Sequence, residues 1–252
     1  MAELNDIVEF LNREMRIEEY QDSSHNGLQV ENSGHVKKVC CGVDASMEFF
    51  EQSLKRHADL LICHHGISWG DSLKQITGLN YRRLAFLLKH DIALYACHIP
   101  LDAHSQLGNN ALLSKAVGLK RKKPFGNYRG KLIGYYGSLP RAQKYSLFKK
   151  RVEKILGNSI QSLEFGGKTV KTIGIVSGGG SEWTEEAHRL NIDAYLTGEA
   201  TLAGYNLAKD CGINVIFGGH YATESFGVKA LGIALGKKFP VKAEFIDLQL
   251  PF

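Results

Sequence analysis

The chain has 252 residues, of which 44% are hydrophobic and 23% charged, and its net charge at neutral pH is +5. This composition is typical of a globular protein with a large core, and charges interrupt every apolar run well before a membrane-spanning length of about 18 residues. The acidic, amphipathic stretch 1–15 lacks the basic start of a signal peptide, so we expect a cytoplasmic protein with no membrane contact.

The five cysteines support the same expectation. They form no CxxC pair, and most lie in apolar, strand-like runs. This pattern predicts buried free thiols in a reducing compartment and argues against a structural zinc site built on thiolates.

Strand-like and helix-like stretches alternate along the chain. The predicted strands cover residues 36–46, 58–65, 92–99, 130–139, 169–178, 193–199, 214–220 and 241–250. The predicted helices between them cover residues 47–57, 80–91, 109–119, 144–156, 183–190, 201–212 and 222–235. Such alternation predicts an α/β fold with mixed or mostly parallel sheets.

The two halves of the chain resemble each other. "HADLLICHH" at 57–65 matches "NIDAYLTGE" at 191–199, and "IALYACHIPLD" at 92–102 matches "NVIFGGHYATE" at 214–224. The offsets, 134 residues (57 to 191) and 122 residues (92 to 214), differ by one 12-residue insertion, for which 66–78 is the natural candidate. We therefore predict two related, interlinked α/β domains, 1–124 and 125–252, and the C-terminal strand could pair back with the first.

Polar residues follow several predicted strands, where open α/β sheets bind ligands. Neighbouring side chains in a strand point to opposite faces, so adjacent His64 and His65 make sense only if the strand ends there and both rings turn toward one partner. We expect Gly66 to ease that bend. His220 and Glu224 stand four residues apart where a helix begins, so they should share a face.

Three further residues have two interpretations each. His98 is either a hydrogen-bonded structural residue or part of the site. Glu199 either caps the helix that follows it or belongs to the site. Asp102 has the same spacing from His98 as Glu224 has from His220, although Pro100 favours a loop there.

The combined donor set predicts a metal site. Nitrogen and oxygen ligands without thiolate suit zinc, iron or manganese. Five protein ligands exceed the three that a catalytic zinc ion takes, so two divalent ions that share a carboxylate and a bridging hydroxide are the better hypothesis. The five candidate ligands are His64, His65, Asp102, His220 and Glu224.

Six segments, in order, resemble the Nif-three-like family, often labelled type-two GTP cyclohydrolase. They are "DSSHNGLQV" (22–30), "GVDAS" (42–46), "ICHHGISWG" (62–70), "HIPLDAH" (98–104), "TGE" (197–199) and "GGHYATE" (218–224). The resemblance implies a dinuclear metal centre on the same five ligands, in the cleft between two linked α/β domains. It also implies a ring-shaped homohexamer, a trimer of dimers.

The leading hypothesis is a dinuclear metal-dependent hydrolase in which a metal-bound hydroxide attacks a nucleotide or related ring compound. His98 and Glu199 would move protons beside the metals. Cleavage of a phosphoester fits the same residues. The alternative is a metal-containing scaffold that binds nucleic acid or a protein partner through the basic stretch 120–123, although a solvated turn is the simpler interpretation of that stretch. Metal storage or delivery is a third possibility.

Overall fold

The computed structural model describes residues 1–250, and its packing divides the chain into two units. The first unit combines Met1–Leu101 with Gly227–Gln249, and the second takes in Asp102–Phe226. The chain therefore leaves the first unit once and returns to it, so the two units are interlinked. The halves 1–124 and 125–252 proposed from the internal repeat stay a prediction.

The first unit is built on a five-stranded mixed sheet with the order β13-β4-β5-β6-β2. Its strands are β13 (Lys242–Phe245), β4 (Lys38–Asp44), β5 (Leu60–His65), β6 (Ala93–Ala96) and β2 (Gly27–Val30). All neighbours are parallel except β2, which runs antiparallel to β6. The strands β1 (Ala2–Glu3) and β3 (His35–Val36) form a separate antiparallel pair.

Helices cover both faces of this sheet because its strands alternate two sets of apolar side chains. Cys40, Leu61 and Leu94 pack with Phe49 and Leu87 from the helices on one face. The helices on that face are α2 (Met47–Leu54) and α3 (Gly78–Lys89), and those on the other are α1 (Leu4–Met15) and the part of α9 (His220–Lys238) from Gly227 onward. The short helix η1 (Ile17–Glu19) follows α1.

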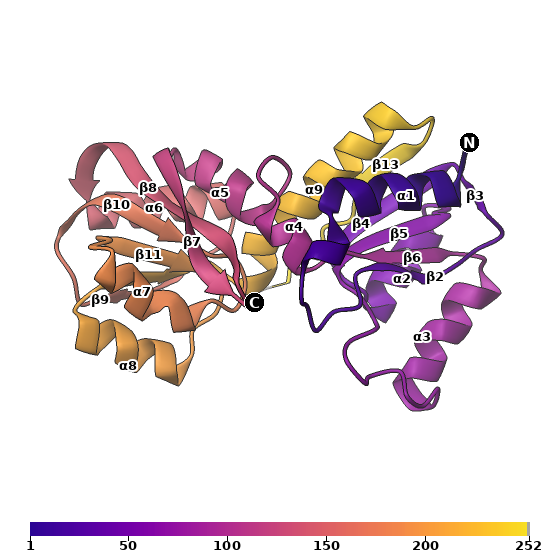
Figure 1. The fold of residues 1–252 in the computed structure, drawn as a ribbon, viewed down its shortest axis with the longest axis horizontal. Coiled ribbons are helices and arrows are strands. Elements are labelled where there is room, and N and C mark those ends of the chain that lie inside the picture. The colour runs from indigo at the N-terminus through magenta and orange to yellow at the C-terminus, as the bar shows by residue number, and fades with distance from the viewer. Residues whose placement is uncertain (251–252) are drawn as a thin grey trace. The chain divides into compact units, whose positions relative to one another are not determined.

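The second unit is built on a six-stranded mixed sheet with the order β7-β8-β10-β11-β12-β9. Its strands are β7 (Lys120–Tyr128), β8 (Lys131–Lys144), β10 (Thr169–Ile175), β11 (Ala194–Thr197), β12 (Asn214–Phe217) and β9 (Gln161–Glu164). Only β10, β11 and β12 are mutually parallel. The helices on one face are α5 (Asn109–Val117) and α6 (Tyr145–Leu156), and those on the other are α7 (Thr184–Arg189) and α8 (Leu202–Cys211) (Figure 1).

The units repeat one local design. Asp59 precedes β5 and Asp193 precedes β11, as the matched sequences require. Asp59 Oδ2 accepts hydrogen bonds from two successive backbone N–H groups near the start of β4, at 2.7 and 2.9 Å. Asp193 Oδ2 does the same near the start of β10, at 2.8 and 2.7 Å. The sequence match of 57–65 with 191–199 thus corresponds to a repeated structural contact.

Two local predictions were wrong. The basic stretch 120–123 is not a turn but the start of β7, an edge strand whose four basic residues are all exposed. Residues Ile99–Ala103 form a short helix, α4, in spite of Pro100. Proline is tolerated in the first helical turn because the N–H group it lacks would have no helical acceptor there.

Two other predictions are confirmed. The five cysteines are free thiols, and all except Cys211 are buried. Within residues 1–250, no helix is both long enough and apolar enough to cross a membrane.

Candidate metal centre

His64 and His65 are the last two residues of β5, and hydrogen bonds to residues at the ends of the two flanking strands orient their rings. His64, fully buried, donates from Nδ1 to the carbonyl oxygen of Cys97 at 2.9 Å. His65 donates from Nδ1 to Asp44 Oδ1, also at 2.9 Å. Because a carbonyl or ionised carboxylate oxygen can only accept, each Nδ1 carries the proton and each Nε2 carries the lone pair that a metal ion requires.

Gly66 has a different role from the one predicted. Its φ angle lies outside the left-handed region, so the backbone there needs no special freedom. A Cβ atom at this position would lie 2.3 Å from Gln29 Oε1 and 2.6 Å from the Cβ atom of Ala96. Gly66 is therefore required by close packing directly behind the two histidines.

His98 joins the pair from the end of β6. Its ring centroid lies 5.1 Å from that of His64 and 5.5 Å from that of His65, whose centroids are 4.6 Å apart. The three histidines can each offer a ring nitrogen within 4.8 Å of the other two, a grouping that could hold a metal ion.

A buried carboxylate fixes the ring of His98. Its Nδ1 donates to Asp22 Oδ1 at 2.9 Å, and the Asp22 side chain is only 2% exposed. Burial alone would raise the pKa of Asp22, but the hydrogen bond and charge of His98, with a further bond from Asn26, outweigh it and hold the pKa at about 2. Asp22 thus stays ionised and keeps the proton of His98 on Nδ1.

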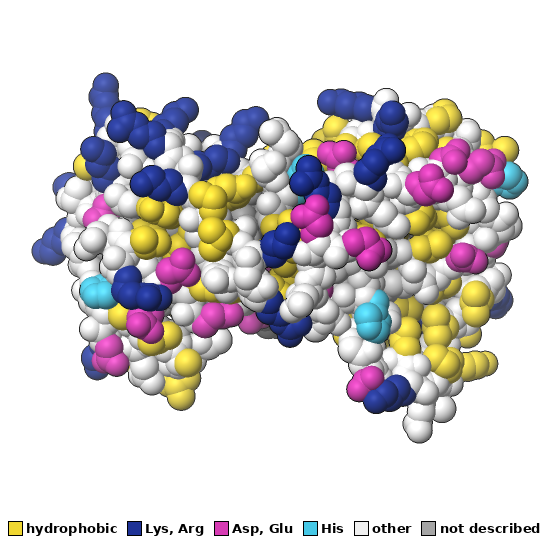
Figure 2. All heavy atoms as spheres, in the orientation of Figure 1, with side chains coloured by type: hydrophobic (Ala, Val, Ile, Leu, Met, Phe, Trp, Pro, Cys, Tyr) yellow, Lys and Arg dark blue, Asp and Glu magenta, His cyan; other side chains and the backbone are white. Residues whose placement is uncertain are grey.

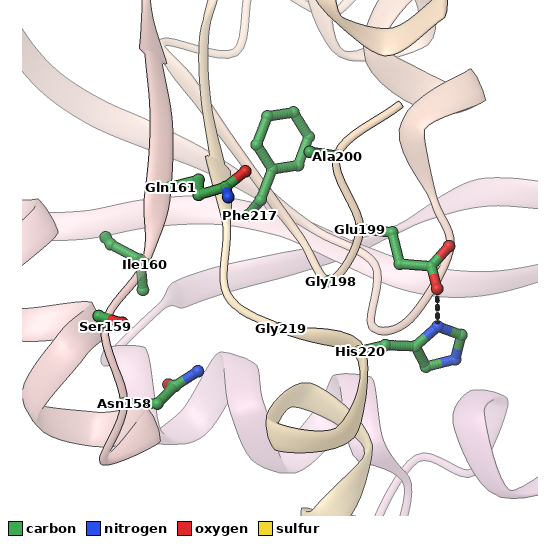
Figure 3. A pocket seen from close by; sticks show the side chains of 10 residues that line it. All are labelled: Asn158, Ser159, Ile160, Gln161, Gly198, Glu199, Ala200, Phe217, Gly219 and His220. Carbon is green, nitrogen blue, oxygen red and sulfur yellow. Dashed lines mark hydrogen bonds and ion pairs between the residues drawn. The ribbon is translucent and has the colours of Figure 1, made fainter. Parts of the chain in front are cut away.

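The second unit places His220 between two carboxylates. His220 begins α9, and its Nδ1 lies 2.6 Å from Glu199 Oε1, in the loop after β11 (Figure 3). Its Nε2 lies 3.0 Å from Oε2 of Glu224, one helical turn along, so the two side chains share a helix face as predicted. Glu199 does not cap α8, because Thr201 accepts the capping hydrogen bond from the Gly204 amide at 2.9 Å.

The electrostatics of this group favour a cation. Burial by itself would lower the pKa of His220, but the hydrogen bonds and charges of Glu224 and Glu199 outweigh it and raise the pKa to about 9. Two carboxylates around one imidazole therefore stabilise positive charge at Nε2, where a divalent metal ion could take the place of the proton.

Gly178 makes room for the carboxylate of Glu224. Its φ angle is +64°, and a Cβ atom there would lie 2.0 Å from Glu224 Oε1 and 3.0 Å from His220 Nε2. Thr223 supports this loop, because its Oγ1 accepts a hydrogen bond from the Gly178 amide at 3.0 Å. The segment 177–183 is thus a strand-to-helix turn that also leaves space for the carboxylate of Glu224.

Asp102, also buried, is oriented within the second unit. Its Oδ1 accepts hydrogen bonds from Asn109 Nδ2 at 2.9 Å and from Ser177 Oγ at 3.0 Å. Since both bonds go to the same oxygen, they fix the plane of the carboxylate and the direction of Oδ2.

The structure therefore groups six of the seven predicted residues into two sets, and Asp102 is the seventh. His64, His65 and His98 come together in the first unit, and Glu199, His220 and Glu224 in the second. Sequence reasoning missed Asp22 and Asp44, the carboxylates that orient His98 and His65. Both lie in segments that carry the family resemblance, "DSSHNGLQV" and "GVDAS", which was the one available signal.

Two mixed sheets and grouped histidine and carboxylate donors define this chain as a two-unit α/β protein with residues suited to metal binding. The chain belongs to the Duf34/NIF3 (NGG1p interacting factor 3) family, whose model matches residues 2–250, and the predicted resemblance is confirmed.

Relatives match along the whole chain. The GTP cyclohydrolase 1 type 2 homolog of Pyrococcus horikoshii is 45% identical over 244 residues, which cover 96% of this chain and 97% of that protein. A solved structure of protein ybgI, of unknown function, has a TM-score of 0.94 at 30% identity and covers 100% of both chains. TTHA1606 from Thermus thermophilus has a TM-score of 0.87 at 34% identity, with the same coverage.

Proposed function

We propose that this protein is a dinuclear metal-dependent hydrolase, like the type-two GTP cyclohydrolase homologs it resembles, and that it acts on a nucleotide or a related ring compound. The proposed ligands are His64, His65, Asp102, His220 and Glu224, and the proposed ions are two of iron, zinc or manganese. A divalent metal held by these groups would polarise an electrophile and activate water for attack.

One observation carries the proposal. His64, His65, His98 and His220 each place Nδ1 within 2.6–2.9 Å of an acceptor oxygen of their own unit. Metal-binding histidines need this arrangement, because the bond at Nδ1 fixes the tautomer, the ring orientation and the basicity of Nε2. Three of these four histidines are proposed ligands, and the arrangement that all four share is poorly explained by packing alone.

Two residues are suited to the transfer of protons. Asp22 orients His98 so that Nε2 can act as a base. The ring of Trp69 packs edge-on against the ring of His98, with 4.9 Å between the two ring centroids, and excludes water from that side. Glu199 is half exposed and hydrogen-bonded to His220, so it can exchange a proton with solvent and with a substrate. We assign His98 as the general base or acid and Glu199 as its counterpart.

Metal content tests the proposal directly. Elemental analysis of protein purified without added metal or chelator should give close to two ions per chain. Glu224→Gln should lower that number and abolish turnover, because it removes one carboxylate charge but keeps the shape of the side chain. Glu185→Ala, at an exposed position on α7, is the matched control and should change neither. Full metal content and turnover in Glu224→Gln would refute this ligand assignment.

The edge strand β7 favours a second candidate, a nucleic-acid-binding scaffold. Lys120, Arg121, Lys122 and Lys123 are all exposed on it, and basic side chains gather over the second unit (Figure 2). Binding of a DNA duplex should weaken steeply with salt and disappear when all four are changed to Gln. Unchanged binding in that variant would exclude this strand as the contact.

Assembly and location complete the proposal. We expect a homohexamer, and exposed apolar side chains on α3, such as Tyr81 at 60% and Leu88 at 65%, are suited to subunit contact. Light scattering on the purified protein tests this expectation. The free cysteines of the chain support a cytoplasmic location.

A further inference from the structure

A pocket of about 390 Å³ in the second unit borders the candidate ligand His220 and Glu199, but its other lining residues have no role in the ligand scheme above. It lies beyond the carboxyl ends of β11 and β12, the usual position of ligands in open α/β sheets. Its volume is within the range of small-molecule sites. Its lining residues are Asn158, Ser159, Ile160, Gln161, Gly198, Glu199, Ala200, Phe217, Gly219 and His220.

The pocket has one reactive side. Glu199 and His220, joined by their hydrogen bond, stand opposite Asn158, Ser159 and Ile160 (Figure 3). The backbone of Glu199 is held in place, since its N–H donates to Gly178 O at 3.1 Å and its carbonyl accepts from Ser181 Oγ at 2.8 Å. A ligand here would therefore meet a preformed carboxylate next to the candidate metal ligand His220.

The remaining walls suit a flat ring. Phe217 ends β12 and is paired in register with Gln161 of β9, so the aromatic ring and the exposed amide lie side by side at the pocket (Figure 3). Gly198 and Gly219 contribute no side chains, and the Gly219 amide bonds to Gly198 O at 3.0 Å, which gives a flat peptide surface. An aromatic ring and bare peptide planes favour stacking of a planar ligand.

The polar groups favour a ligand that donates hydrogen bonds. Asn158 Nδ2 donates to Gly218 O at 3.0 Å, and none of the described residues donates to its buried Oδ1. A ligand N–H, directly or through a water molecule, would satisfy that oxygen. Glu199 adds carboxylate oxygens, and the Gln161 amide can donate to a ring carbonyl.

The charges argue against a phosphate in this pocket. None of its ten lining residues, all within the described part of the chain, is a lysine or an arginine, and the one basic side chain, His220, is already paired with the carboxylates of Glu199 and Glu224. Phosphate sites are built from such side chains or from several converging backbone N–H groups. The carboxylate of Glu199 would repel an anion.

We propose that this pocket binds an uncharged, planar nitrogen heterocycle by its ring, with an N–H edge toward Glu199 and with any phosphate outside the pocket. This inference rests on the proposed function for the chemistry that follows binding, but not for the binding itself. It names the part of the substrate that the protein recognises: the ring and its hydrogen-bonding edge.

Calorimetric titration of the full-length protein with guanosine, adenosine and inorganic triphosphate tests the inference. Guanosine offers adjacent ring N–H and amino donors to a carboxylate, whereas adenosine offers a bare ring nitrogen at that position. Guanosine should therefore bind at least about tenfold tighter, roughly the worth of one hydrogen bond to a charged group. Triphosphate should not displace it.

Two variants locate the binding. Gln161→Ala should weaken guanosine binding about tenfold with unchanged metal content. Gln106→Ala, at an exposed position of the same unit, is the matched control and should bind like the wild type. Glu199→Gln should reduce the preference for guanosine over adenosine, a change that a merely structural role would not cause.

The two proposals fail in different ways. Guanosine binding that depends on Gln161, in a chain without metal or turnover, would sustain the ring pocket and refute the hydrolase. No binding of either nucleoside, equal binding by Gln161→Ala, or displacement by triphosphate would overturn the ring pocket, whatever the metal content.

Discussion

Gly178→Ala should displace the carboxylate of Glu224 while leaving the fold intact. The new Cβ atom would lie 2.0 Å from Glu224 Oε1, whereas real Cβ contacts are not shorter than 3.0 Å. The carboxylate must therefore retreat by about 1 Å, and Glu224 is 3% exposed with little space to do so. His220 Nε2, at 3.0 Å from the same point, would be disturbed as well.

Gly212→Ala separates this clash from backbone strain. Gly212 ends α8 with a φ angle of +63°, almost that of Gly178, but a Cβ atom there meets only Phe165 O at 3.8 Å. Both variants should lose about 1 kcal/mol because alanine is strained in the left-handed region. Gly178→Ala should lose about 1–3 kcal/mol more, the usual cost of overpacking.

Urea unfolding of the two variants measures that difference, and titration with zinc measures the functional consequence. We expect metal affinity to fall about 10–100-fold in Gly178→Ala, as when a supporting contact to a ligand is lost, and to be unchanged in Gly212→Ala. Equal stability of the two variants would refute the packing argument. Unchanged metal affinity in Gly178→Ala would refute the role of Glu224 as a ligand.

Three further predictions follow from single contacts. Asp22→Asn should lower the free energy of unfolding by about 2 kcal/mol at pH 7, because a folded-state pKa lowered from 3.8 to about 2 stabilises the fold above pH 4. The difference in free energy of unfolding between this variant and the wild type should close as the pH falls from about 4 to 2. Asp71→Asn, at an exposed position, is the control and should show no such difference. A difference that persists at pH 2 would contradict this account. His98→Ala should slow turnover about 10²–10⁴-fold and leave metal content largely intact, and loss of metal would instead make His98 a ligand. Asp59→Ala and Asp193→Ala should each cost about 1–3 kcal/mol in urea unfolding, since each leaves two backbone N–H groups without their acceptor, and clearly unequal costs would argue that the repeated contact is not energetically equivalent.

Much of the fold is visible in local patterns. Six parallel strands are short apolar runs between amphipathic segments: β4, β5 and β6, and their counterparts β10, β11 and β12. Their residue types alone therefore predict that they are buried. The strands β2, β7 and β9 were not predicted. Each is polar or partly exposed and is a strand because a neighbouring strand offers hydrogen bonds, which no local pattern records.

The candidate ligands were also visible, since histidines and carboxylates at strand ends are unusual wherever they occur. Their supporting residues were not. Asp22 lies 76 positions from His98, and Asp44 lies 21 positions from His65. Nothing in the spacing of an aspartate says which histidine it will orient, because that choice is made by the order of strands in the sheet.

The sequence by itself determined the α/β class, the internal repeat and the identity of the donor side chains, because apolar periodicity and residue chemistry are local properties. Only the tertiary structure decided which nitrogen of each histidine carries the proton, why Gly66 and Gly178 must be glycine, and that β7 is an edge strand. Those features depend on atoms brought within hydrogen-bonding or van der Waals distance by strand pairing. Such contacts join residues whose separation along the chain carries no signal of their proximity.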